Sequence, residues 1–415
     1  MTTELRALRK EDWNVWYDTL LRAFGGAPEP AEERELWQEL TEVDRSIGAW
    51  DGDQCVGSAG AFDFRLTVPG GAVVPAAGVT MVGVAATHRR RGVLTSMMRR
   101  QLDDIRSWGE SLAVLTASEP VIYGRFGYGL ATHRLSADID TTRVRLSVPP
   151  GADDVRLRYA DPAEVLDACE AVYARRVPER PGMLARRPGW ERLGLLDTDR
   201  HRDGASPLQC VVAERAGDGG GSEVVGYTRF RIKSDWGPGG AEGVVRLSAL
   251  EAVDPAAHAA LWRFLFDIDL TGSIVAHRLP VDEPALHLVS DIRRCALGVK
   301  DDLYLRLVDV GAALRERTYQ APLDVVFEVD DPFCPWNEGR WRLIGDPKGA
   351  TCERTADAAD LSLSVRELGS AYLGGVSLSS LAAAGRVREL RQGALAEAST
   401  GFLVSGSAPW LPHGF

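Results

Sequence analysis

A run of three arginines between two apolar segments constrains the fold of this chain more than any other feature. The string VTMVGVAATHRRRGVL (79–94) leads from an apolar, extended segment into the arginines at 89–91 and then Gly92. The string VLTSMMRRQLDDIRSW (93–108) places its apolar residues on one stripe, which predicts an amphipathic helix that ends before Gly109. A helix N-terminus presents unpaired amides, and glycine lets an anion approach them closely. The pattern predicts an anion site that suits a pyrophosphate; a solvated basic turn is the alternative.

The segments on either side of this turn predict a domain of the α/β class. Expected elements are helices at 12–24 and 31–43 and strands at 45–50, 55–66, 78–85 and 111–118. The strand before the basic turn and the strand after the helix are both apolar enough to be buried. A strand, loop, helix and strand in this order is typical of α/β folds.

The same order returns in the middle of the chain, which we interpret as an internal duplication of the fold. Here Asp254-Pro255 reads as an N-cap followed by proline at the first helical position. A carboxylate at this place repels an arriving phosphate, so we expect the second copy to be scaffold. The expected elements are a hairpin of 208–215 and 222–232 with its turn at 216–221, a strand at 244–253, a helix at 256–269 and a strand at 271–277.

The pattern changes near residue 300, where strands and turns come before helices. Expected elements are strands at 301–310, 322–329, 341–345 and 350–355 and a helix at 311–317. Single cores rarely grow past about 300 residues, so a chain of this length requires several. We therefore expect three domains of α/β and α+β class, at 1–150, 151–297 and 298–415.

Charge and residue spacing exclude several kinds of partner. The 48 Lys and Arg against 59 Asp and Glu leave a net charge of −11, which disfavours nucleic acid, because phosphate binding needs a basic face. The six cysteines form no C-x-x-C pair and the seven histidines show no metal spacing, so we expect no metal site. The start of the chain is charged where a signal peptide is apolar, and no run of about 18 uncharged apolar residues occurs. We expect a cytoplasmic protein without a membrane partner.

Two strings together resemble a known family. THRRRG (87–92) and ASEPVIYGRFGYG (117–129) are similar to the Eis-type (enhanced intracellular survival) branch of the GCN5-related N-acetyltransferases. Members of this branch join two acetyltransferase-like domains to a third that is sterol-carrier-like. The strings WRLIG (341–345), DLSLSVRELGSAYLGG (360–375) and LAAAGRV (381–387) resemble that third domain, so the resemblance covers essentially the whole chain. It implies two tandem acetyltransferase-like folds, the second of them degenerate, followed by an α+β domain.

The resemblance also implies acetyl-CoA as co-substrate and assigns residues to it. The backbone of Val82 and Val84 would pair with the pantetheine arm, as an added strand pairs with a sheet edge. The pyrophosphate would be held by the amides of six consecutive residues: Arg89, Arg90, Arg91, Gly92, Val93 and Leu94. The family string is Q/R-x-x-G-x-G/A, and this chain departs from it with Leu94 in place of the last small residue.

For catalysis, the resemblance implies Tyr123 as general acid and the C-terminal carboxylate of Phe415 as base. A phenol of pKa about 10 is reasonably matched to a leaving thiolate whose conjugate acid has a pKa near 8.5. A terminal carboxyl of pKa about 3.5 is a poor base in water, and desolvation beside an incoming ammonium raises its pKa. The alternatives are a core tyrosine in a glycine-rich turn and a disordered tail.

The implied reaction is direct acetyl transfer to primary amines of a small polycationic molecule, with aminoglycosides acetylated at several positions. The nine carboxylates between residues 29 and 53 could attract such an amine, although a solvated helix face is the favoured interpretation. We expect Phe24 and Trp37 in the amine pocket. Two other functions stay open: a non-catalytic acyl-CoA or lipid-binding module, and a protein-lysine acetyltransferase. The resemblance further implies a homo-hexamer.

Overall fold

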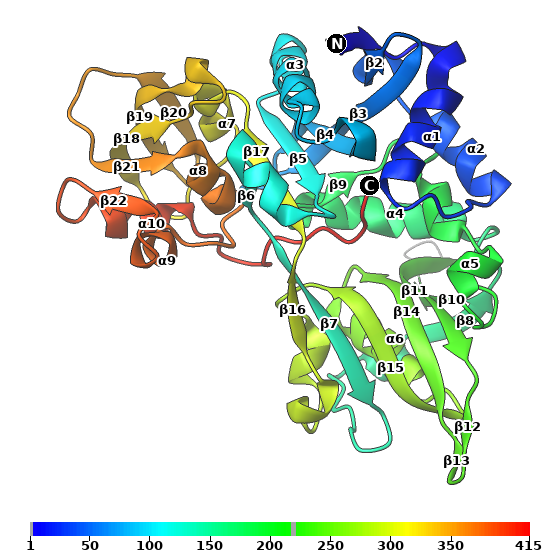
Figure 1. Ribbon diagram of the computed structural model, residues 1–415. Coiled ribbons are helices and arrows are strands. Elements are labelled where there is room, and N and C mark those ends of the chain that lie inside the picture. Colours follow the sequence, from blue (N-terminus) through cyan, green and yellow to red (C-terminus); the bar gives the residue numbers. More distant parts are fainter. Residues whose placement is uncertain (1–2, 217–220) are drawn as a thin grey trace. The chain divides into compact units, whose positions relative to one another are not determined.

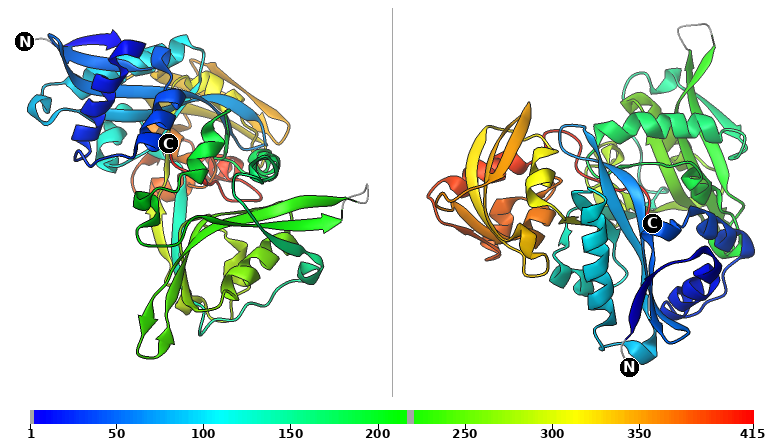
Figure 2. Two further views of the ribbon diagram at one scale, coloured as in Figure 1. Left: turned by 90° about the vertical axis from the view of Figure 1, so that its right-hand side faces the viewer. Right: turned by 90° about the horizontal axis from the view of Figure 1, so that it is seen from above.

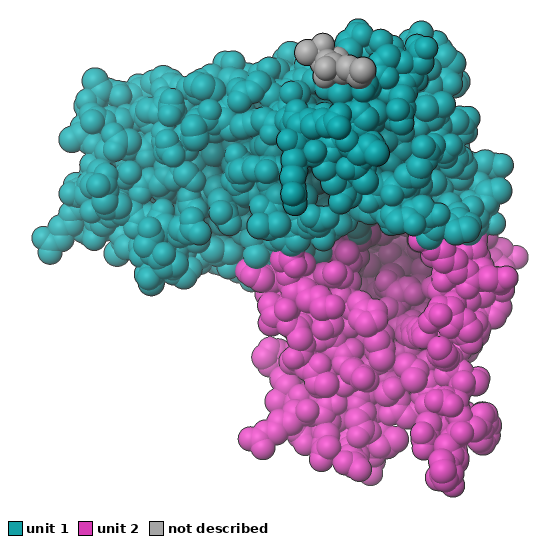
Figure 3. All heavy atoms as spheres, viewed as in Figure 1, with its two compact units in different colours: residues 1–132, 302–409, 414–415 teal, residues 133–301, 410–413 magenta. Residues whose placement is uncertain are grey.

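The computed structural model describes residues 3–216 and 221–415, which form two compact units (Figures 1 and 3). Unit 1 comprises residues 1–132, 302–409 and 414–415. Unit 2 comprises residues 133–301 and 410–413. The expected turn at 216–221 falls largely on residues 217–220, which lie outside the described residues.

The first sheet of unit 1 contains one parallel pair of neighbouring strands, β4 and β5, among antiparallel ones. Its strand order is β1-β2-β3-β4-β5-β17-β6. The strands are β1 (Glu4–Ala7), β2 (Ile47–Asp51), β3 (Gln54–Thr67), β4 (Val73–Val84), β5 (Leu112–Thr116), β6 (Gly129–Leu130) and β17 (Leu303–Leu307). Strand β17 was expected among the strands of a third domain, but it lies between β5 and β6.

Three helices cover this sheet: α1 (Trp13–Ala23), α2 (Ala31–Leu40) and α3 (Val93–Ser107). Figures 1 and 2 show α1 on one side of β3 and β4 and α3 on the other. The stripe predicted on α3 is confirmed for Met98, Leu102 and Ile105, which are fully buried against the sheet. Trp108, expected on the same stripe, is partly exposed because it follows the last helical residue and stacks under the Arg45 guanidinium.

Helix α2 is shorter than the spacing predicted. It ends at Leu40, and a short 3₁₀ turn at Val43–Arg45 takes the place of its last expected residues. The side chain of Thr41, the first residue after the helix, donates a hydrogen bond to the Trp37 carbonyl and so caps the helix end.

Unit 1 also contains a smaller sheet of order β20-β19-β18-β21-β22. Its strands are β18 (Leu323–Asp330), β19 (Gly339–Asp346), β20 (Gly349–Arg354), β21 (Leu361–Ser364) and β22 (Val387–Glu389). Helices α7 (Val310–Arg315), α8 (Val365–Ala371), α9 (Leu378–Ala383) and α10 (Ala394–Phe402) accompany it. The strands expected at 322–329, 341–345 and 350–355 are therefore confirmed.

Unit 2 is built on a second sheet, of order β16-β7-β15-β14-β11-β10-β8. Its strands are β7 (His133–Asp140), β8 (Arg156–Ala160), β10 (Gln209–Ala216), β11 (Ser222–Lys233), β14 (Gly243–Ala252), β15 (Thr271–Leu279) and β16 (Gly298–Asp301). Helix α6 (Pro255–Phe266) connects the parallel strands β14 and β15, just as α3 connects β4 and β5. The duplicated order of elements is thus present in both sheets.

The two connecting helices begin differently. The Asp254 carboxylate accepts hydrogen bonds of 2.9 Å from the amides of Ala256 and Ala257 and so caps α6. The N-cap of α3 is Gly92, which has no side chain to offer. The amides that an anion would use are therefore already occupied in unit 2.

Asp254→Ala is expected to destabilise unit 2 by about 1 kcal/mol, the usual cost of losing an N-cap side chain. The change removes both hydrogen bonds to the first turn of α6 and the Arg215 contact at 3.3 Å. Urea unfolding monitored by fluorescence measures the change, and Asp254→Asn, which still caps a helix, is the control. An unchanged midpoint for Asp254→Ala would show that this cap contributes nothing.

Within the described residues, no helix is both long and apolar enough to cross a membrane.

Candidate active site

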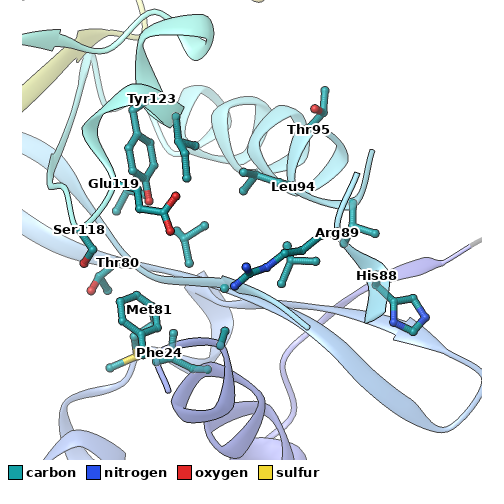
Figure 4. Close-up of a pocket in the computed structure, with 18 of the residues that line it drawn as sticks. Phe24, Thr80, Met81, His88, Arg89, Leu94, Thr95, Ser118, Glu119 and Tyr123 are labelled. Atoms are coloured by element: carbon teal, nitrogen blue, oxygen red, sulfur yellow. The ribbon is translucent and has the colours of Figure 1, made fainter. Parts of the chain in front are cut away.

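The site begins where the parallel strands of the first sheet separate. Strands β4 and β5 pair only at Ala76–Gly78 with Leu112–Val114, although β4 continues to Val84. On its other side β4 stays paired with β3 across a bulge, where Met81 adopts a left-handed φ of 52°. The last six residues of β4 therefore have a backbone edge that β5 does not use. A cavity of about 980 Å³ in unit 1 opens along this edge (Figure 4).

One end of the cavity is formed by the start of α3. Arg89, Arg90, Gly92, Val93 and Leu94, five of the six residues expected to hold the pyrophosphate, line it. Gly92 has a φ of 82°, and a Cβ placed on it would meet nothing within 4 Å, so the space beside the first amides of the helix is open. The positive end of the helix dipole and two guanidinium groups make this end suited to a phosphate.

Arg91 is exposed and is not among the residues that line the cavity. His88 fixes the turn before Arg91 with two hydrogen bonds of its ring. Nε2 lies 3.1 Å from a carboxylate oxygen of Asp51, and Nδ1 lies 2.8 Å from the Thr87 hydroxyl oxygen. Val82 and Val84 line the cavity from the free edge of β4. An extended ligand arm could therefore pair with this edge as an added strand would.

Tyr123 lies on the opposite wall, in the 3₁₀ segment Pro120–Phe126 that follows β5. Its ring meets that of Tyr128 edge to face, with centroids 6.0 Å apart. Burial, with a smaller contribution from the Glu119 carboxylate, raises the pKa of Tyr123 to about 12. Figure 4 shows Tyr123 and Glu119 side by side and pointing into the cavity. The phenol is therefore protonated at any physiological pH.

The glycines of the string GRFGYG allow close packing under this wall. A Cβ on Gly127 would lie 1.6 Å from Nη1 of Arg306, and one on Gly129 would lie 2.0 Å from the Arg366 carbonyl oxygen. Arg306, on β17, is fully buried and donates two hydrogen bonds to the Asp331 carboxylate, at 2.8 and 3.0 Å. The loop that carries Tyr123 thus rests directly on β17 and α8.

The C-terminal residue reaches the same cavity. Phe415 lines it, and its ring contacts that of Phe64 edge to face at a centroid distance of 5.0 Å. The hydroxyl of Thr116, at the end of β5, donates to a carboxylate oxygen of Phe415 at 3.4 Å. A Cβ on Gly78 would lie 2.3 Å from the Phe64 ring and 3.3 Å from the Phe415 ring, so this glycine leaves room for both rings. The structure therefore orders the tail end rather than leaving it frayed.

Phe24, which follows the last residue of α1, and Trp37 on α2 line the cavity. Tyr17, Leu20 and Leu21 line it from α1. Among the described residues, none of the nine carboxylates between residues 29 and 53 lines the cavity. Its Glu32, Glu35 and Glu39 are exposed, as the interpretation of a solvated helix face requires.

Sequence reasoning missed Thr116 and Glu119. Both lie just after the apolar core of β5, where a parallel strand ends and its next residues point into the crevice. Glu119 also falls inside the string ASEPVIYGRFGYG, so its position in the motif was a usable signal.

Family models match the chain in three places. An acetyltransferase (GNAT) domain matches residues 4–131, a second acetyltransferase (GNAT) domain matches 182–307, and a sterol carrier protein domain matches 310–412. These matches confirm a fold of two acetyltransferase domains followed by a sterol-carrier-like domain.

Relatives and solved structures match along the full chain. An uncharacterized N-acetyltransferase of Streptomyces avermitilis is 75% identical over all of both chains. N-acetyltransferase Eis of Mycobacterium tuberculosis is 36% identical over 410 residues, which is 94% of each chain. The crystal structure of Eis1 from Mycobacterium abscessus superimposes with a TM-score of 0.83 at 34% identity and covers all of both chains. The diverging strands, the open helix start and these matches lead to one conclusion: the chain belongs to the Eis-type GCN5-related N-acetyltransferases, which use acetyl-CoA as co-substrate.

Proposed function

We propose that this protein transfers an acetyl group from acetyl-CoA directly to a primary amine of a small polycationic acceptor. Aminoglycosides are the acceptor class that the family suggests, with acetylation at one or several positions. One observation carries the proposal: a single cavity has an uncapped helix start with two arginines at one end and a protonated phenol beside two carboxylates at the other. Acetyl transfer to an amine is served by a site for the cofactor phosphates, a proton donor for the leaving thiolate and a base for the amine.

In this proposal the chain holds the cofactor with main-chain groups. Val82 and Val84 pair with the pantetheine arm along the free edge of β4, and the amides from Arg89 to Leu94 hold the pyrophosphate. Arg91 contributes its amide and its charge from outside the cavity. Bound there, acetyl-CoA supplies the thioester carbonyl that the amine attacks.

Tyr123 and Phe415 then donate and accept the protons that the reaction moves. The attacking amine must be neutral, and the Phe415 carboxylate accepts the proton that the ammonium loses. Tyr123 donates its proton, or a hydrogen bond, to the departing thiolate. Because its pKa is raised, the phenol is protonated at neutral pH, which is the form that a general acid requires. No residue of the chain is acylated on this route.

The alternative of a lipid-binding module is disfavoured by the interior of the sterol-carrier-like domain. Arg317 lies there fully buried and donates to the carbonyl oxygens of Phe402 and Tyr372. Its guanidinium also lies over the rings of Tyr319 and Phe402. A charged group packed into the centre of this domain leaves little apolar space for a lipid tail. We assign to residues 298–415 the role of delivering the C-terminus, and to 1–150 and 151–297 those of catalytic domain and scaffold.

The test is release of free CoA from acetyl-CoA, with aminoglycosides, polyamines and lysine peptides as acceptors. We expect turnover with the small polycations and a fall in kcat of about 10²-fold for Tyr123→Phe, the usual contribution of a general acid. Tyr159→Phe, at an exposed tyrosine of unit 2, is the matched control and should keep native kcat.

Binding of acetyl-CoA without turnover of any acceptor would favour the acyl-CoA-binding module. Turnover of lysine peptides alone would favour a protein-lysine acetyltransferase. A cytoplasmic location and a homo-hexameric assembly are part of the same proposal.

A further inference from the structure

Among the described residues, Glu119 has the only acidic side chain that lines the cavity. The other charged side chains there are basic: Arg89, Arg90 and Arg125. These guanidinium groups repel an acceptor with several ammonium groups, whereas negative groups attract it. The cavity offers two negative groups, the Glu119 side chain and the Phe415 terminus.

The two carboxylates are held differently. The Phe415 carboxylate accepts a hydrogen bond from Thr116 and is fixed by the ring contact with Phe64. The Glu119 side chain is exposed and has neither a hydrogen bond nor an ion pair within the described chain, while its carbonyl oxygen accepts a hydrogen bond of 3.1 Å from the Ile122 amide. It adjoins Pro120, the first residue of the 3₁₀ segment that carries Tyr123, so its backbone is anchored while its carboxylate is free.

The carboxylates near the wall formed by α1 and α2 already contact other side chains. The Glu29 carboxylate accepts a hydrogen bond of 2.8 Å from the Tyr17 hydroxyl, and Arg34 pairs with Asp18 at 2.9 Å. Neither Glu29 nor Asp18 lines the cavity. The wall of α1 and α2 therefore presents mostly rings and aliphatic groups to an acceptor.

We propose that Glu119 binds an ammonium group of the acceptor that is not the reacting amine, and thereby makes the enzyme prefer diamines and polyamines over monoamines. The inference rests on the proposed acetyl transfer and adds a specificity-determining residue to it. The reacting amine lies between the thioester and the Phe415 carboxylate, and the second ammonium lies on the Glu119 side, next to Tyr123.

The kinetic test compares spermidine with n-butylamine as acceptors for the native protein and Glu119→Gln. We expect KM for spermidine to rise about 10- to 100-fold in Glu119→Gln, because a charged hydrogen bond is lost, while KM for n-butylamine changes less than threefold. Glu35→Gln, at an exposed carboxylate of α2 outside the cavity, is the matched control and should change neither constant. An equal KM for spermidine in native protein and Glu119→Gln would overturn the proposal.

Two further readouts accompany the KM values of Glu119→Gln. Glu119→Asp keeps the charge and should keep most of the preference for spermidine. Because the Glu119 carboxylate raises the pKa of Tyr123, Glu119→Gln should also move the alkaline limb of kcat/KM for n-butylamine to lower pH. A loss of preference in Glu119→Asp as complete as in Glu119→Gln, with an unmoved alkaline limb, would contradict a role for this charge.

Calorimetric titration of spermidine into the CoA-bound protein separates this inference from the proposed function. Binding that is lost in Glu119→Gln, with no turnover by the native protein, would support recognition by Glu119 and reject acetyl transfer to amines. Turnover by the native protein with equal spermidine binding in both forms would reject the recognition and keep the transfer. Absence of both binding and turnover in the native protein would reject both.

Discussion

Addition of one glycine after Phe415 is expected to lower kcat for acetyl transfer by about 10²-fold or more, the contribution of a lost general base. The extension converts the Phe415 carboxylate into a neutral amide and moves the new carboxylate one residue away. The cavity itself is left intact, since its other walls come from residues 17–125. Release of free CoA from acetyl-CoA with spermidine measures the effect.

The control for this experiment keeps the carboxylate and the ring. Phe415→Tyr preserves the edge-to-face contact with Phe64 and the hydrogen bond from Thr116, so kcat should stay within a few-fold of native. Native kcat in the glycine-extended protein would show that the terminal carboxylate does not act as base, whatever the effect of Tyr123→Phe.

Asp331→Ala is expected to reduce the free energy of unfolding of unit 1 by about 3–5 kcal/mol, the usual cost of breaking a buried ion pair. The Asp331 carboxylate is fully buried and accepts hydrogen bonds from Arg306, from the Asn337 amide group at 2.9 Å and from the Cys334 backbone at 3.0 Å. Its loss leaves the Arg306 guanidinium buried beneath the Gly127 turn without a counter-charge.

Chemical denaturation of Asp331→Ala tests this cost, with Asp357→Ala as control. Asp357 pairs with Arg342 at 3.4 Å with more than half of its side chain exposed, so its loss should have a much smaller effect. Similar unfolding midpoints for Asp331→Ala and the native protein would contradict the structural role assigned to this pair. The Asp331 variant should also lose activity before it unfolds, because the Tyr123 loop rests on Arg306.

The part of the site that local sequence encodes was predictable. The strand, arginine turn and amphipathic helix from residue 79 to 108 form as expected, because the apolar period and the glycine act within a few residues. The contrast between Gly92 and Asp254 also followed from local rules for helix starts. The resemblance supplied Tyr123 and Phe415, and the cavity contains both.

The rest depends on contacts between distant segments, which periodicity does not encode. Strand β17 has the pattern of any buried strand, and nothing in it indicates that its partners are β5 and β6 rather than β18. Residues 133–140, expected in the first 150-residue segment, pair with β15 and β16 in the second sheet for the same reason. The motif ASEPVIYGRFGYG contains Glu119, but only the tertiary structure places it as the one acidic side chain among the described residues that line the cavity.

The place of β17 sets an order of events during synthesis. The first sheet is still incomplete when its N-terminal strands leave the ribosome. The strand that pairs with the other edge of β5 is β17, which is made only when residues 303–307 are translated. Until then β5 is an open edge, and the Tyr123 loop lacks the strand on which it rests. The nascent chain must therefore keep an incomplete sheet from pairing with other chains while residues 133–301 of unit 2 are translated.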